Sequence, residues 1–485
     1  MKEVATIILC VFLVFALTVC GVAVVNIGAL IEEEYAEHYF MGEAGSAVSE
    51  ITIYHRESGS ELNGCSFLIS LSEFDGMKLE AVVSQGEETD KPQEIKWSSS
   101  NPKAATVDDQ GNVSFLHTGA TLIKASNGFG SRKTASFEII LKTNPGSPDF
   151  MYVPHEADRV ADSILSKAGK NSINLILGAD MHNMGDGESS YQKVVNQIRE
   201  SNQHAGQAMA LIADEVDVDI LAILGDITWG SNTTTIDQGT QGINLAKEYL
   251  TDAMSKSKYS VMLSGNHDYM YGSSAFSDYH YKDYSDKKVR AIFLNTTDGG
   301  SENISAEQLQ WFADSLDLSE KEDAADWGII ILSHHPLDWG NIIHAANVLQ
   351  AYLSGSSYSV IHNGAQVSCD FAGKNAATVI AQFHGNTHCL KVDYIHYMSD
   401  GIAVPLEIQR IAIPNACFQR NNEYGQNNRT ESHGIEFGES TTYKKTASTA
   451  QDTSFCVVSI DLDLKEIYVD CYGAGYDRVI HYGRN

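Results

Sequence analysis

Five groups of polar residues that can bind metal ions follow short apolar runs in the second half of the chain. In order, the groups are Asp180-Met181-His182, Gly225-Asp226, Gly265-Asn266-His267-Asp268, His334-His335 and Gly385-Asn386-Thr387-His388. The apolar runs have the length and composition of buried strands. Because the carboxyl ends of parallel strands meet at one edge of a sheet, we expect these groups to converge on one crevice.

The groups supply imidazole nitrogens together with carboxylate and amide oxygens, and they contain no thiolate. Such a mixed set suits Mn²⁺, Fe²⁺ or Zn²⁺. Each group alone is more often a turn or a hydrogen-bonded loop than a metal site. The prediction of a metal site therefore depends on the occurrence of all five in this order.

The joint pattern resembles the calcineurin-like metallophosphoesterase superfamily, whose groups are Asp-x-His, Gly-Asp, Gly-Asn-His-Asp/Glu, His and Gly-His-x-His. The resemblance covers about residues 170–390. It implies that two divalent metal ions, bridged by Asp226, hydrolyse a phosphate mono- or diester. The ligands that it implies are Asp180, His182, Asp226 and His388 for the first ion, with Asn266, His334 and Asn386 for the second.

The same resemblance assigns catalytic roles to His267 and Asp268. His267 is expected to donate a proton to the leaving oxygen or to stabilise charge on phosphorus, with Asp268 fixing its tautomer. His335 is expected to support the neighbouring ligand His334 rather than to bind a metal itself. Trp229 stands where purple acid phosphatases have a tyrosine ligand, and an indole cannot ligate, so a ferric enzyme is disfavoured.

The last group departs from the family pattern, because Asn386 replaces the first histidine of Gly-His-x-His. An amide oxygen binds first-row metals less tightly than imidazole does, so we expect a weaker or harder second ion, Mn²⁺ or Mg²⁺. His384 could substitute, although alternation along the strand does not place it in the site. The departure leaves open an alternative function, in which a weakened or inactive surface protein binds or adheres through its N-terminal domain.

The elements that must position these residues form an α/β layered domain over 151–485, predicted as two mixed β-sheets flanked by helices. Strands are expected at 173–180, 219–226, 259–266, 290–297, 327–334 and 377–385. Helices are expected at 191–216 and 239–255, and a capping box at Ser305–Gln308 opens another.

Residues 49–143 have the short alternating runs of an all-β domain. Four segments resemble the bacterial Ig-like domain of group 2: Trp97–Pro102, Ala105–Val107, Gly111–Val113 and Thr118-Gly119. The resemblance implies a spacer or adhesive module on a bacterial surface, in which Trp97 is expected to pack in the core. Residues 144–150 are rich in proline and glycine and are predicted to be a linker.

The run from Ala5 to Leu30 carries no charge and is long enough to cross a membrane. We therefore predict a signal-anchor transmembrane helix over 1–34 and a polar stalk over 35–48. Lys2 before the run and the acidic residues after it place the catalytic domain outside the cell, at the membrane. A cleaved signal peptide, which would give a secreted protein, is the alternative.

Charge and cysteine content limit the partners and the cross-links. The formal net charge of −30 argues against bulk nucleic acid as a partner. A small phosphate ester or a cell-envelope component is compatible, because bound metal reverses the local field. Outside the predicted span the cysteines contain no Cys-x-x-Cys pair, so no structural zinc site is expected, and the sequence does not choose among their possible pairings.

Overall fold

The computed structural model describes residues 48–71, 74–85, 95–127, 134–142, 152–188, 192–231, 233–271, 275–374, 377–417, 430–432, 440–442 and 450–483. The chain divides into two compact units between Asp149 and Phe150. The predicted transmembrane helix (1–34), nearly all of the stalk (35–48) and the linker (144–150) lie outside the described residues. No helix within the described ranges combines the length and apolar character needed to cross a membrane.

The first unit is a sandwich of two four-stranded sheets, with strand orders β1-β3-β6-β5 and β2-β8-β7-β4. Its strands are β1 (Val48–His55), β2 (Ser66–Ser70), β3 (Gly76–Gln85), β4 (Ile95–Ser99), β5 (Ala105–Val107), β6 (Asn112–Phe115), β7 (Gly119–Asn127) and β8 (Thr134–Lys142). Ile53, Leu79 and Phe137 are buried between the sheets, and Trp97 packs against this core, as predicted.

The first sheet of the second unit has the strand order β11-β10-β9-β22-β23-β24. Its strands are β9 (Ser172–Gly178), β10 (Ile220–Leu224), β11 (Ser260–Leu263), β22 (Ser454–Asp461), β23 (Glu466–Gly473) and β24 (Arg478–His481). β9, β10 and β11 are parallel, and β22 joins β9 in the antiparallel direction. The outer face of this sheet packs against α3 (Tyr152–Lys167), α4 (Gln192–Glu215) and α5 (Ile236–Lys256).

The second sheet has the strand order β12-β13-β14-β17-β19-β18. Its strands are β12 (His280–Tyr284), β13 (Val289–Phe293), β14 (Gly328–Ser333), β17 (Thr378–His384), β18 (Lys391–Ser399) and β19 (Ile402–Ala412). β13, β14, β17 and β19 are parallel. Its outer face packs against α6 (Ala306–Leu316), α7 (Ile343–Ser354) and the hairpin of β15 (Ser357–His362) and β16 (Ala365–Asp370).

The remaining described elements are short. They are η2 (Ala324–Asp326), η3 (Gly340–Ile342), η4 (Ala450–Asp452), β20 (Thr430–Ser432) and β21 (Ser440–Thr442).

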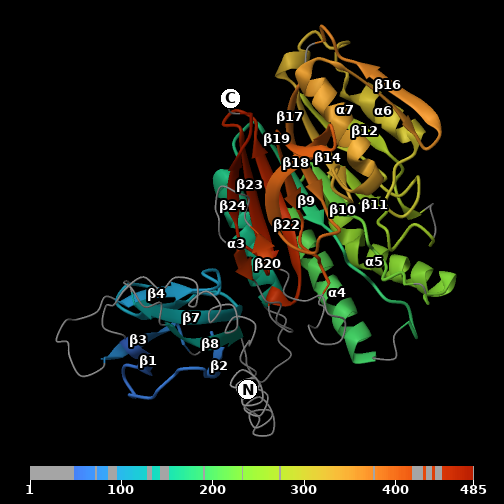
Figure 1. The fold of residues 1–485 in the computed structure, drawn as a ribbon. Helices are drawn as coiled ribbons and strands as arrows, with labels where there is room; N and C mark the ends of the chain where they lie inside the picture. Colours follow the sequence, from blue (N-terminus) through green and yellow to red (C-terminus); the bar gives the residue numbers. More distant parts are fainter. Residues whose placement is uncertain are drawn as a thin grey trace, which may run out of the picture. The chain divides into compact units, whose positions relative to one another are not determined.

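The two sheets of the second unit face each other across one apolar core, with the helices on the outer faces (Figure 1). Leu175 of β9 and Ile330 of β14 both lie in this central core and are fully buried. Their neighbours Ile176 and Ile331 point to the opposite faces and are buried under the helices. Because the strands are covered on both faces, they appear in the sequence as nearly continuous apolar runs. The mixed sheets and flanking helices agree with the prediction.

Helix α6 begins at the predicted cap, but only half of the predicted capping box forms. The Ser305 hydroxyl accepts a hydrogen bond from the Gln308 backbone N–H at 3.0 Å. The Gln308 side chain does not return this bond. Instead it binds the backbone N–H and C=O of Asn295 at 2.9 and 2.7 Å. Gln308 therefore fixes the loop that follows β13.

A buried ion pair connects the two sheets at the amino end of β10. Asp219 is 1% exposed. Its Oδ2 accepts hydrogen bonds from Lys287 Nζ at 2.6 Å and from the Asn174 N–H at 2.9 Å. Lys287 lies in the turn between β12 and β13, so the pair joins the first sheet to the second.

Replacing Asp219 with alanine is expected to lower the free energy of unfolding by about 3–5 kcal/mol, because Lys287 would stay largely buried without its carboxylate. Urea denaturation followed by circular dichroism measures this change. Asp217→Ala is the matched control, since the Asp217 side chain is 76% exposed and pairs only at the surface with Lys258. The control substitution should lower the free energy of unfolding by less than about 1 kcal/mol. Equal losses in the two variants would contradict the role given to the buried pair.

Candidate metal centre

The carboxyl ends of five parallel strands carry the predicted metal ligands. Asp180 and His182 follow β9, Asp226 follows β10, Asn266 follows β11, His334 follows β14, and Asn386 and His388 follow β17. The first three strands belong to one sheet and the last two to the other. The centre is therefore assembled from both halves of the sandwich.

Asp180, His182, Asp226 and His388 form a compact cluster, with one potential ligand atom of each within 4.8 Å of the others. The Nε2 atoms of His182 and His388 lie 3.0 Å apart. His388 Nε2 lies 3.4 Å from Asp180 Oδ1, and His182 Nε2 lies 3.9 Å from Asp226 Oδ2. The structure thus brings together the residues that the sequence assigned to the first metal ion.

A second group of ligand atoms meets the other oxygen of Asp226. His334 Nε2 lies 3.3 Å from Asp226 Oδ1 and 3.1 Å from Asn266 Oδ1. His334 Nδ1 lies 2.7 Å from the carbonyl oxygen of Leu224, to which it donates. This bond orients the ring so that Nε2 faces Asp226 and Asn266, the arrangement that metal-binding histidines use. Asp226 therefore offers one oxygen to each group.

The charge states of the cluster fit divalent cations. Burial alone would raise the pKa of Asp226, but the adjacent imidazoles of His334 and His182 hold it well below its usual range. Burial lowers the pKa of His182 well below its ordinary value. Although burial opposes it, the Asp226 carboxylate raises the pKa of His334 to about 9. Asp226 is thus ionised and His182 neutral at pH 7, while a metal must displace a proton from His334.

An unpartnered oxygen gives a second indication. Asp180 Oδ2 is buried, and no hydrogen-bond partner for it occurs in the described part of the chain. A buried carboxylate oxygen without a donor is costly unless a cation compensates it. The described residues therefore fit the metal ions that the fold family implies.

The ligand loops adopt an unusual backbone conformation. Five of the site residues have positive φ: Asp180 (52°), His182 (46°), Asp226 (53°), Asn386 (64°) and His388 (56°). This conformation costs about 1–3 kcal/mol for a residue other than glycine. Hydrogen bonds between the loops help to hold it, since the Asp180 N–H donates to Gly225 O at 3.0 Å and the His182 N–H to Asp226 O at 2.9 Å.

Two glycines permit the close approach of ligands. A Cβ at Gly225, whose φ is +87°, would lie 2.4 Å from His334 Nδ1. A Cβ at Gly265 would lie 2.2 Å from Asp226 Oδ1. Neither position has room for a side chain, which explains the glycine before Asp226 and before Asn266 in the motif.

His267 lies beside the centre, but Asp268 does not fix the tautomer of His267 as expected. His267 Nδ1 contacts the carbonyl oxygens of Trp229 and of Gly230, the latter at 3.0 Å. These carbonyls, rather than Asp268, fix the tautomer of His267.

Asp268 lies in the same loop and accepts hydrogen bonds from three backbone N–H groups. They belong to Ile227 (3.0 Å), Thr228 (2.9 Å) and Gly265 (2.9 Å). Burial and the Asp226 charge raise the pKa of Asp268 to about 7 despite these donors. Asp268 thereby ties the loop after β11 to the loop after β10.

The three remaining candidates take different positions. His335 Nε2 lies 3.1 Å from Asn266 Oδ1, and its Nδ1 lies 2.8 Å from the hydroxyl of Thr296. His384 contacts its neighbour, with Nδ1 2.8 Å from Gly385 O. The backbone N–H of Asn386 donates to Asp180 Oδ1 at 3.1 Å.

From the sequence, Trp229 was expected only to be unable to ligate a metal, and Thr296 was not predicted at the centre. The ring of Trp229 lies 5.5 Å from that of His182 and 6.3 Å from that of His267, between centroids. Thr296 contacts His335 Nδ1 from a loop that carries none of the predicted ligands. The position of Trp229, three residues after Asp226, brought it into the sequence analysis, whereas no motif pointed to Thr296.

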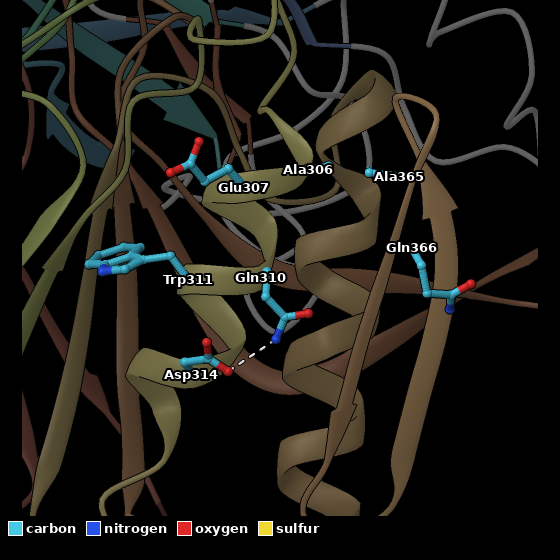
Figure 2. Close-up of a pocket in the computed structure, with 7 residues that line it drawn as sticks. All are labelled: Ala306, Glu307, Gln310, Trp311, Asp314, Ala365 and Gln366. Atoms are coloured by element: carbon cyan, nitrogen blue, oxygen red, sulfur yellow. Dashed lines mark hydrogen bonds between the residues drawn. The ribbon is translucent and has the colours of Figure 1, made fainter.

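A separate hollow of about 460 Å³ lies over α6 and β16 (Figure 2). It is lined by Ala306, Glu307, Gln310, Trp311, Asp314, Ala365 and Gln366. None of these residues belongs to the metal centre. Trp311 also packs against Tyr279, with ring centroids 4.9 Å apart.

Comparisons with known proteins confirm both resemblances. The family described as calcineurin-like phosphoesterase matches residues 174–390, and the bacterial Ig-like domain (group 2) matches residues 69–136. Among solved structures, the chain is similar to an intimin mutant of EHEC O157:H7, with 25% identity, a TM-score of 0.13, and coverage of 19% of this chain and 47% of that one. It is also similar to NAD nucleotidase (NadN) of Haemophilus influenzae, with 13% identity, a TM-score of 0.24, and coverage of 64% and 49%. The chain spans about half the length of each. No curated protein matches it.

Introducing an imidazole at position 386 is expected to strengthen the second metal site. The wild-type protein, passed through metal-free buffer after loading with Mn²⁺, should retain about one ion per chain, whereas Asn386→His should approach two. Elemental analysis by mass spectrometry measures both. Asp400→His is the control, because Asp400 also has a positive φ, of 51°, and is exposed in the turn between β18 and β19. An unchanged metal content in Asn386→His would contradict this role of position 386.

Proposed function

We propose that this chain hydrolyses a phosphate mono- or diester with two divalent metal ions. It carries a calcineurin-like phosphoesterase domain preceded by a bacterial Ig-like domain of group 2. The observation that carries this proposal is the position of Asp226. Its Oδ2 lies 3.9 Å from His182 Nε2, and its Oδ1 lies 3.3 Å from His334 Nε2. One carboxylate thus serves two sets of ligands, as a two-metal site requires.

The residues that would hold the ions fall into two sets that share Asp226. They are Asp180, His182, Asp226 and His388 for the first ion, and Asp226, Asn266, His334 and Asn386 for the second. The donor atoms suit Mn²⁺, Fe²⁺ or Zn²⁺. Bound divalent ions lower the pKa of water toward neutrality and compensate the charge of a phosphate.

His267 is the proton donor in the proposed reaction. Its backbone N–H donates to Asp226 Oδ1 at 2.9 Å, which holds the residue beside the shared carboxylate. Because Nδ1 donates to the carbonyls of Trp229 and Gly230, the proton on Nε2 of the imidazolium is the one that can pass to a leaving oxygen. The ring also lies 4.9 Å from the ring of His182, between centroids.

The assay that tests the proposal compares bis-p-nitrophenyl phosphate with p-nitrophenyl phosphate in the presence of Mn²⁺. Hydrolysis of bis-p-nitrophenyl phosphate would identify a diesterase, and hydrolysis of p-nitrophenyl phosphate would identify a monoesterase. His267→Ala is expected to lower kcat by about 10²–10⁴-fold, because a positioned proton donor contributes that much. Asp226→Asn should abolish turnover, since it removes the charge shared by both ligand sets.

His396→Ala is the control, because the His396 side chain pairs with Asp338 and is not one of the predicted ligands. It should keep the wild-type rate. Full activity in Asp226→Asn would refute the assignment of the site. Absence of hydrolysis with every divalent metal tested would instead select the second candidate function, a binding or adhesive protein, which the replacement at Asn386 favours.

We also propose that the domain acts at the outer face of a cell membrane on a small phosphate ester or an envelope component. The uncharged run over 5–30, with Lys2 before it and acidic residues after it, supports this orientation. Protease added to intact cells should digest the catalytic domain while leaving a cytoplasmic marker intact. Protection of the domain until the cells are lysed would contradict an external location.

A further inference from the structure

Two buried cysteines face each other on neighbouring strands of the first sheet, away from the metal ligands. Cys456 of β22 and Cys471 of β23 are direct partners in the antiparallel register. Both are 0% exposed, and their sulfur atoms lie 3.5 Å apart. A disulfide requires about 2.0 Å, a difference that rotation of the two side chains can close.

The backbone hydrogen bonds show that the pair has the favourable geometry for a cross-link. The Cys471 N–H donates to Asp477 Oδ1 at 3.0 Å, and its carbonyl accepts from Arg159 at 2.8 Å. Both groups therefore point away from Cys456, which makes the cysteines a non-hydrogen-bonded pair. In such pairs the Cα atoms approach to about 4.5 Å. This separation lies within the range of about 4.4–6.8 Å that disulfides span.

The chain after β23 leaves room for the sulfur of Cys471. Gly475 has a φ of +137°, and a Cβ there would lie 2.9 Å from Cys471 Sγ. A larger residue at this position would press on the sulfur. The absence of a side chain at Gly475 therefore lets the Cys471 sulfur occupy its place opposite Cys456.

We propose that Cys456 and Cys471 form a disulfide when the chain folds in contact with a disulfide oxidant, such as oxidised glutathione or a thiol–disulfide oxidoreductase. One thiolate attacks the external disulfide, giving a mixed disulfide and releasing one thiol. The second thiolate then displaces the other thiol and closes the protein disulfide. The oxidant takes two electrons, and the two cysteine protons end on the two released thiols.

Burial determines when the bond forms and how long it lasts. In the folded chain neither sulfur is accessible, so the exchange takes place before β22 and β23 are packed against the core. Once formed, the bond is shielded from thiol reductants. β22 also pairs with β9, the strand that precedes Asp180. The cross-link therefore fastens β23 to β22, the strand that pairs with β9. Its formation does not depend on metal or on catalysis.

Peptide mapping tests the proposal directly. The full-length protein is refolded in a buffer of oxidised and reduced glutathione, denatured, alkylated and digested with trypsin. Cleavage after Lys445, Lys465 and Arg478 places the two cysteines on separate peptides, each with a single cysteine. The expected product is one cross-linked peptide pair, lighter by two hydrogens than the two unlinked peptides together. Reduction should remove this product. Native protein should keep the bond in dithiothreitol, and denatured protein should lose it.

Cys369→Ser is the matched control, because Cys369 lies on β16 outside this pair, and it should leave the cross-link intact. Cys471→Ala should release Cys456 for alkylation and lower the melting temperature by several degrees relative to the oxidised wild type, with no difference from the reduced wild type. Full alkylation of both cysteines in the refolded, oxidised protein would overturn the proposal. So would a cross-link of either one to another cysteine in folded protein.

Discussion

The carboxylate of Asp226 is buried between two groups of imidazoles, and the architecture around it keeps this charge in place. A buried carboxylate is costly unless positive charge and hydrogen bonds compensate it. His334 and His182 lie against its two oxygens, and the His267 N–H donates to one of them. Glycines at 225 and 265 make room for these contacts, because a side chain at either would collide with a ligand. The positive φ values of the ligand loops show that the backbone is held in an unfavourable conformation to allow this convergence.

The centre depends on the packing of two sheets rather than on one. The first sheet supplies Asp180, Asp226 and Asn266, while the second supplies His334 and His388. The sheets share a continuous apolar core, and the Asp219–Lys287 pair joins them at the amino end of β10. Displacement of one sheet against the other would therefore separate the two sets of ligands. This explains how residues spread from 180 to 388 in the sequence can serve one site.

Strands, helices and ligand types could be predicted from the sequence because they depend on local composition and spacing. Buried strands are continuous apolar runs, and each predicted ligand stands directly after one. The supporting contacts depend on residues that only the fold brings together. Asp268 binds backbone N–H groups about forty residues away, and His335 meets Thr296 across a similar interval. Gln308 holds Asn295 instead of closing its capping box, and the register of β22 and β23 selects Cys456 and Cys471 among many pairings.

We propose that Asp226 bridges two metal ions of unequal affinity. Anomalous diffraction from crystals soaked in Mn²⁺ tests it most directly, because it locates the ions without reference to turnover. Two peaks about 3.5–4 Å apart are expected on either side of the Asp226 carboxylate, the weaker one on the side of Asn266 and His334. A single peak at full Mn²⁺ saturation, or two peaks that do not share Asp226, would contradict it.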